Sequence, residues 1–131
     1  MVKQVAQKSA MPAFYKIDKR RRFVLSTISG EITYAEALAH QRDISADRDF
    51  DATFAQIADF TYGTLAKISP EELRQFAQRS IFSPEARRAI IVPNLADYGL
   101  GRMYETLRDL AGQTGVRAFR TLEEALDWVA A

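Results

Sequence analysis

The feature that most constrains the fold is a short apolar run followed by an unusually clear helix start. Residues 54–60 read FAQIADF, which predicts a central β-strand covered on both faces. The segment Ser69–Glu72 combines a serine cap, a proline at the first helical position and a glutamate three residues after the cap. Between them, residues 61–68 contain Gly63 and no clear period, which predicts a loop.

The flanking segments repeat this alternation of strand and helix. Strands are predicted at 13–18, 23–30, 89–92 and 116–120, and further helices start at Thr33, near Leu100 and at Thr121. Thr33 and Thr121 each have a glutamate three residues later, as in a capping box. We therefore expect an α/β fold, a mostly parallel mixed sheet of about five strands with about four helices. The expected order is β-β-α-β-α-β-α-β-α.

Length and composition indicate one ordinary globular domain. The chain has 131 residues, of which 47% are hydrophobic and 27% charged. Residues 13–131 are predicted to form the domain, and residues 1–12 a flexible N-terminal arm. The formal net charge is only +1, so no overall charge attracts nucleic acid, and none is expected as a partner.

The residue inventory excludes several kinds of chemistry. The sequence has no cysteine and a single histidine, His40, which we interpret as a surface residue of the first helix. We expect no metal, no cofactor and no catalytic residues, because no metal-ligand cluster, nucleophile–base pair or phosphate-binding loop is visible. No run approaches the length of a membrane span, and we predict a cytoplasmic protein.

A basic cluster marks the turn between the first two strands. It comprises four consecutive residues, Lys19, Arg20, Arg21 and Arg22. One interpretation is a solvated turn that discourages pairing between sheet edges. The other is a contact for an anionic partner, such as an acidic protein surface, a phosphate or a lipid head group.

The chain resembles the STAS fold and, more closely, the SpoIIAA-like (STAS-type) family of small bacterial domains. The resemblance covers about residues 13–131 and is carried by IADF, ISPEEL, YGLGRMYETLRDL and FRTLEEALDWV. It implies a non-enzymatic regulatory domain that docks a protein partner through residues 61–76. Anti-sigma-factor antagonists of this class are phosphorylated on a serine at the position comparable to Ser69. Here Ser69 lies within Lys67–Glu71 in place of the Asp-Ser-Ser-Gly motif, and it is also interpreted as a helix cap.

The carboxyl ends of the central strands offer an alternative function. Ligands of open α/β sheets bind at this edge. The predicted rim contains side chains with polar groups, namely Asp59, Thr61, Tyr62, Asn94, Tyr98 and Arg102. This pattern favours a module that binds a lipid or another small apolar or anionic molecule. A homodimer is a further interpretation, with Tyr34, Trp128 and the N-terminal arm as its candidate interface.

Overall fold

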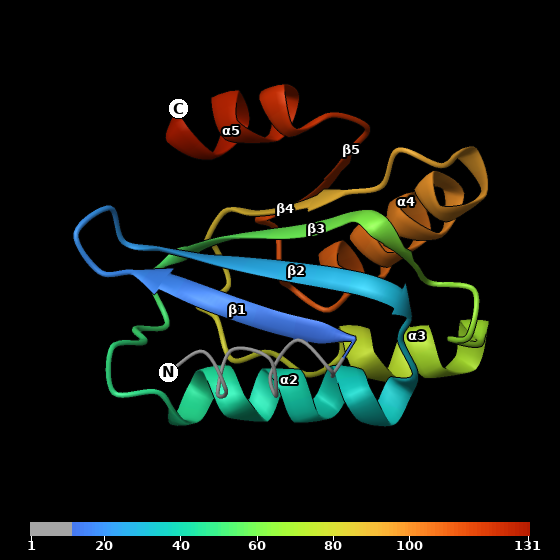
Figure 1. Ribbon diagram of the computed structural model, residues 1–131, viewed down its shortest axis with the longest axis horizontal. Helices are drawn as coiled ribbons and strands as arrows, with labels where there is room; N and C mark the ends of the chain where they lie inside the picture. The colour runs from blue at the N-terminus through green and yellow to red at the C-terminus, as the bar shows by residue number, and fades with distance from the viewer. Residues whose placement is uncertain (1–11) are drawn as a thin grey trace.

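A computed structural model describes residues 12–131 and contains one mixed sheet with helices on both faces (Figure 1). Its strands are β1 (Ala13–Asp18), β2 (Phe23–Glu31), β3 (Ala55–Thr64), β4 (Arg88–Ile91) and β5 (Val116–Phe119). Its helices are α2 (Tyr34–Ala46), α3 (Pro70–Ala77), α4 (Leu95–Leu110) and α5 (Leu122–Ala130). The predicted α/β class and order of elements are confirmed. The predicted arm lies outside the described residues, apart from Pro12.

The strands lie side by side in the order in which they occur in the chain, β1-β2-β3-β4-β5. β1 pairs antiparallel with β2, and the other three pairings are parallel. β3 is therefore the middle strand, and the carboxyl ends of β2 to β5 meet at one edge of the sheet. Within the part of the chain that is described, no helix is long and apolar enough to span a membrane.

β3 is longer than the sequence predicted, because residues 61–64 continue the strand instead of forming a loop. After a register shift, Ser29–Glu31 of β2 pairs with residues 62–64. Gly63 allows this pairing, since a Cβ at that position would lie 2.7 Å from the carbonyl oxygen of Ile28. The glycine was interpreted as a loop signal, but its function is to let two backbones approach closely.

The two faces of the sheet are covered unequally. α5 alone packs on one face, where Ala125 contacts a cluster containing Ile57 and Ile91. α2, α3 and α4 cover the other face, where a larger core includes Leu73 and Tyr104 (Figure 1). Trp128 of α5 is half-buried and packs against the Phe119 ring at 5.5 Å between centroids.

The helix starts follow their capping signals closely. Thr33 and Ser69 both form complete capping boxes, as predicted. Thr121 accepts a hydrogen bond from the backbone of the third helical residue, Glu124. α4 starts earlier than the predicted region near Leu100, because Asn94 caps it through two backbone N–H groups. These local bonds satisfy backbone N–H groups at the helix starts that have no partner within the helix.

Candidate functional site

A cavity of about 120 Å³ lies between the sheet and the layer formed by α2, α3 and α4. Its wall is largely aliphatic and aromatic, and includes Ile28, Ile32, Leu65, Leu73, Phe76 and Ile90. Two alanines on the wall, Ala37 of α2 and Ala58 of β3, carry only methyl groups and leave space between the helices and the sheet. A concave apolar site with a few polar groups is the usual form of a small-molecule site.

The helical layer leaves part of the middle strand uncovered. Gln56, Ala58 and Phe60 of β3 are only partly buried, although β3 has two strands on either side. All three residues line the cavity. A parallel strand in the middle of an α/β sheet is normally buried on both faces. The partial exposure of these three residues therefore departs from the usual packing, and it occurs where the cavity lies.

Polar side chains form a row across the sheet at the floor of the cavity. Gln56 and Arg88 are register partners on β3 and β4, and Ser26 lies on the neighbouring β2. Gln56 Nε2 donates a hydrogen bond of 3.0 Å to Ser26 Oγ. Ser26 is fully buried, so the row places hydrogen-bonding groups inside an otherwise apolar layer.

His40 joins this row from α2. Its Nε2 lies 2.9 Å from Ser26 Oγ, and its ring packs edge-on against Tyr15 at 5.8 Å between centroids. Burial lowers the pKa of His40 to about 4, so the ring is neutral at neutral pH. The interpretation of His40 as a surface residue is therefore wrong. α2 places this side chain against the sheet, where Ser26 is its hydrogen-bond partner.

Two buried arginines complete the polar part of the cavity. Arg88 of β4 is 5% exposed and Arg108 of α4 is 0% exposed. Arg108 Nε donates a hydrogen bond of 2.7 Å to the Tyr104 hydroxyl. Arg108 Nη1, Arg108 Nη2 and Arg88 Nε are buried and have no hydrogen-bond partner within residues 12–131. Arginine is rarely buried to this degree unless its charge is paired.

Aromatic rings, and not carboxylates, surround these two guanidinium groups. Arg88 lies over the Phe82 ring at 4.9 Å, and Arg108 lies over Tyr104 at 5.1 Å and over Phe76 at 6.0 Å. None of the ion pairs among the described residues includes either arginine. Burial lowers the pKa of Arg88 to about 10, and the charge of Arg108 contributes to this shift. Arg88 nevertheless stays protonated at neutral pH.

The predicted rim divides into separate groups in the structure. Asp59 Oδ1 accepts hydrogen bonds from the backbone and hydroxyl of Thr61, and this pair is local. Tyr98 and Arg102 are neighbours on α4 and line a second, open cleft. Tyr62 is 81% exposed.

Asn94, the remaining rim residue, uses its side chain to cap α4. In the described part of the chain, no hydrogen bond or ion pair connects Asp59 and Thr61 with Asn94, Tyr98 or Arg102. None of the six rim residues lines the cavity between the sheet and the helical layer. The ligand-binding role predicted for the rim residues stays a prediction.

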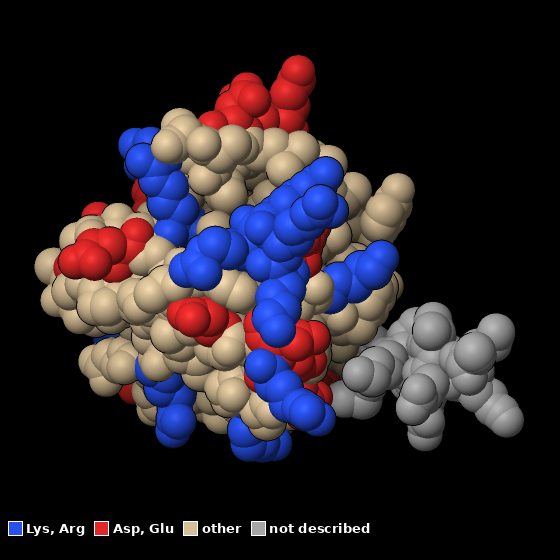
Figure 2. All heavy atoms as spheres, turned by 90° about the vertical axis from the view of Figure 1, so that its left-hand side faces the viewer, with Lys and Arg blue, Asp and Glu red and all other residues tan. Residues whose placement is uncertain are grey.

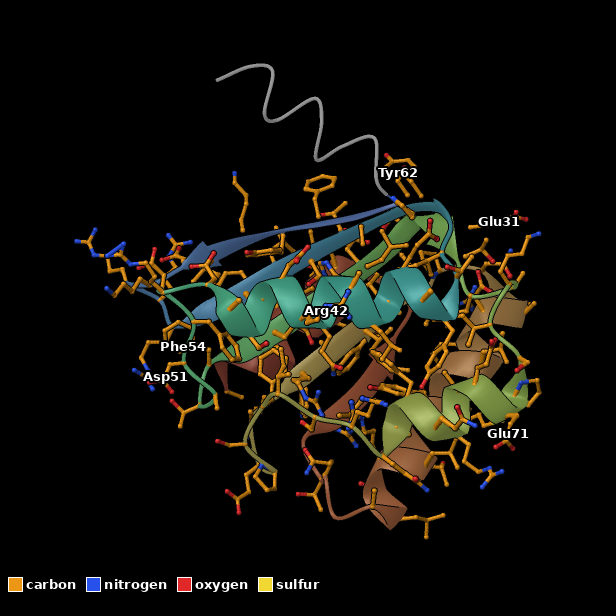
Figure 3. The ribbon with its side chains drawn as sticks, turned by 90° about the horizontal axis from the view of Figure 1, so that it is seen from below. Glu31, Arg42, Asp51, Phe54, Tyr62 and Glu71 are labelled. Atoms are coloured by element: carbon orange, nitrogen blue, oxygen red, sulfur yellow. The ribbon has the colours of Figure 1, made fainter. Side chains whose placement is uncertain are left out.

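Ser69 is exposed at the start of α3, the helix that carries Glu71 (Figure 3). Its Oγ accepts a hydrogen bond of 3.1 Å from the backbone of Glu72, and its backbone donates one of 3.0 Å to Glu72 Oε1. Ser69 therefore caps the helix, as one of the two interpretations predicted. Phosphorylation at this serine stays a prediction.

At the end of the molecule opposite to α3 lies the basic turn (Figure 1), where Figure 2 shows basic side chains interspersed with acidic ones. Two ion pairs reduce its charge, Lys19–Asp49 at 3.5 Å and Arg21–Asp18 at 3.8 Å. Arg22 donates a hydrogen bond to Thr53 and lies over the Phe54 ring at 5.0 Å. Arg20 has no ion pair among the described residues. The anionic-partner contact stays a prediction.

The sequence interpretation missed the two arginines, although their positions carry a signal. Arg88 is the first residue of the apolar strand β4 and has the same parity as Ile90 and Val92, which face the helices. Arg108 follows Tyr104 by four residues, which places both on one side of the helix. Comparison of the chain with protein-family models, curated proteins and solved structures found no match.

Proposed function

We propose that this domain is a small-molecule-binding module whose site is the cavity above β3. The observation that carries the proposal is the incomplete cover of the middle strand at Gln56, Ala58 and Phe60. An uncovered central strand forfeits apolar burial, at about 25 cal/mol for each Å² left exposed. A ligand in the cavity would restore that burial and would find hydrogen-bonding partners in the polar row.

A cavity-filling variant tests this function. The full chain is screened by thermal shift against a panel of small organic acids, amides and alcohols, and each hit is confirmed by calorimetry. Ala58→Leu places a larger side chain inside the cavity, while Ala66→Leu adds the same atoms at an exposed position. Ala58→Leu should stay folded and lose the response, and Ala66→Leu should keep it. A panel without any hit, or equal responses in both variants, would contradict the proposal.

The resemblance to SpoIIAA-like domains supports a second, compatible function as a non-enzymatic regulatory domain. The order of elements fits that family, and α3 takes part both in the cavity wall and in the predicted docking surface at 61–76. Tyr62 supports docking because a ring that is 81% exposed leaves apolar area available to a partner. Incubation with cell extract and ATP, followed by phosphopeptide mapping, tests the regulatory switch. If Ser69 carries no phosphate after this incubation, the proposed regulatory switch is contradicted.

A further inference from the structure

The two buried arginines present hydrogen-bond donors that the fold itself does not use. Arg88 Nε and the two Nη atoms of Arg108 are buried without partners in the described part of the chain, and both side chains line the cavity. Burying a charge without an opposite charge is costly, and each unmade hydrogen bond adds to that cost. Packing alone therefore gives no reason for these side chains, since an apolar side chain of similar volume would fill the same space.

A bound anion would compensate the two buried arginine charges better than water would. Arg88 and Arg108 line the same cavity, and the positive charge of Arg108 contributes to lowering the pKa of Arg88. Water can accept their hydrogen bonds but leaves both positive charges uncompensated. Aromatic faces from Phe76, Phe82 and Tyr104 offset part of the charge, and one negative group placed against the two arginines would offset much of the rest.

The donors fit a carboxylate better than a phosphate. The two Nη atoms of Arg108 form a guanidinium fork that matches the planar oxygens of a carboxylate, and Arg88 Nε offers one further donor at the same cavity. Phosphate sites commonly use lysine, glycine-rich loops or helix N-termini. Among residues 12–131, no lysine or glycine lines the cavity, and Arg108 lies in the last turn of α4, far along the helix from its N-cap Asn94.

The size of the cavity limits the rest of the ligand. A volume of about 120 Å³ is somewhat smaller than that of an apolar protein cavity of about 150 Å³ known to bind benzene. The apolar part of the ligand is therefore a single ring or a short branched chain, and a long acyl chain does not fit. We propose that the cavity binds a small carboxylic acid of this size, with its carboxylate on Arg88 and Arg108 and its apolar body among the surrounding aromatic and aliphatic side chains.

The inference rests on the proposed ligand-binding function, and the experiment separates the two. Calorimetry on the full chain compares benzoate and phenylacetate with the neutral analogues benzamide and benzyl alcohol, and with phenyl phosphate and decanoate. We expect one of the two aryl acids to bind at least about tenfold more tightly than the other probes, because the neutral analogues lack the charge, phenyl phosphate lacks the planar carboxylate and decanoate exceeds the cavity.

Variants locate the carboxylate. Arg108→Met and Arg88→Met should each weaken binding of the best acid by about tenfold or more, whereas Arg102→Met changes an exposed arginine on the same helix and should leave it unchanged. Circular dichroism checks that each variant is folded.

The remaining outcomes contradict the carboxylate, the choice of anion, the size limit or the binding function itself. Equal binding of acids and neutral analogues, or an Arg108→Met variant that binds as tightly as the unmodified chain, overturns the carboxylate inference and leaves the binding function standing. Tighter binding of phenyl phosphate overturns the choice of anion, and tighter binding of decanoate overturns the size limit. If no probe binds, the inference falls together with the proposed function.

Discussion

His40 on α2 and Ser26 on β2 are joined across the cavity floor by a hydrogen bond of 2.9 Å. Ser26 also accepts a hydrogen bond from Gln56, so one buried hydroxyl connects two strands and a helix. The imidazole in this connection is neutral at neutral pH, because burial disfavours the charged ring more than nearby Asp43 favours it. The helical layer is therefore attached to the sheet by a group that responds to pH.

The first prediction concerns the titration of His40. In an unfolded chain this residue takes up a proton near pH 6.5, but in the folded domain only near pH 4. The unfolded state thus binds more protons between these values, and the free energy of unfolding should fall by roughly 2–3 kcal/mol as the pH drops through that window. His40 is the only histidine, so its ring proton resonance can be followed by NMR in a tag-free chain. A midpoint near 6.5 would contradict the prediction.

The second prediction concerns the stability cost of Arg108. Replacing its buried, unpaired charge with an apolar side chain should raise the free energy of unfolding by about 1–3 kcal/mol. Arg108→Met is measured by urea denaturation in the absence of added ligand. Arg102→Met is the matched control on the same helix. It removes the ion pair between the exposed Arg102 and the largely buried Glu105, which also accepts a hydrogen bond from the backbone of Ala118, and should lower stability by about 1 kcal/mol or less. A loss of stability in Arg108→Met would show that the fold itself needs this charge.

The contrast between the helix starts and the cavity shows what the sequence can predict. Ser69 and Thr33 cap their helices through bonds to residues three positions away, and such local chemistry is readable from the chain. Arg108 is buried because of what α4 packs against, which depends on Tyr104, Phe76 and the sheet beneath. On the same helix Leu110 is 80% exposed, whereas Arg108 is fully buried. The rule that apolar residues lie inside and charged residues outside holds for most cores but not for this site.

The position of the cavity, like the burial of Arg108, depends on tertiary packing. The sequence placed the candidate site at the carboxyl ends of the strands, because open α/β sheets usually bind there. That expectation assumes that the helices close over the rest of the sheet. Small side chains at Ala37 and Ala58 leave the middle of the sheet uncovered here. The distance between two layers is a tertiary property, and no local pattern in the chain reports it.

The third prediction concerns Ser69 as a structural residue. Ser69→Ala removes the side-chain half of a capping box and should cost about 1 kcal/mol, whether or not the serine has a regulatory function. Ser69→Asp keeps an oxygen acceptor for the backbone of Glu72 and should stay close to the unmodified stability. Urea denaturation of the two variants measures the difference. If Ser69→Asp is as unstable as Ser69→Ala, the cap is not the reason for the loss.

The fourth prediction compares glycines with opposite surroundings. Gly99 lies inside α4, and a Cβ there would meet nothing within 4 Å. Gly99→Ala should therefore stabilise the domain by roughly 0.5–1 kcal/mol, because alanine favours the helix and restricts the unfolded chain. Gly115 precedes β5, and a Cβ there would lie 2.1 Å from the carbonyl oxygen of Ala86.

Gly115→Ala should thus force two backbone segments apart and destabilise the domain by about 2 kcal/mol or more. The same backbone carries the hydrogen bond of 2.8 Å from the Arg88 N–H to the Gly115 carbonyl, so the shift should also displace Arg88 at the cavity. Thermal and urea denaturation give the stability, and calorimetry with an acid that binds the unmodified chain gives the effect on the site. Gly99→Ala should raise stability and leave that affinity unchanged, and Gly115→Ala should lower both. Opposite signs in the two variants are the expected result, and a common sign would contradict the packing described for either glycine.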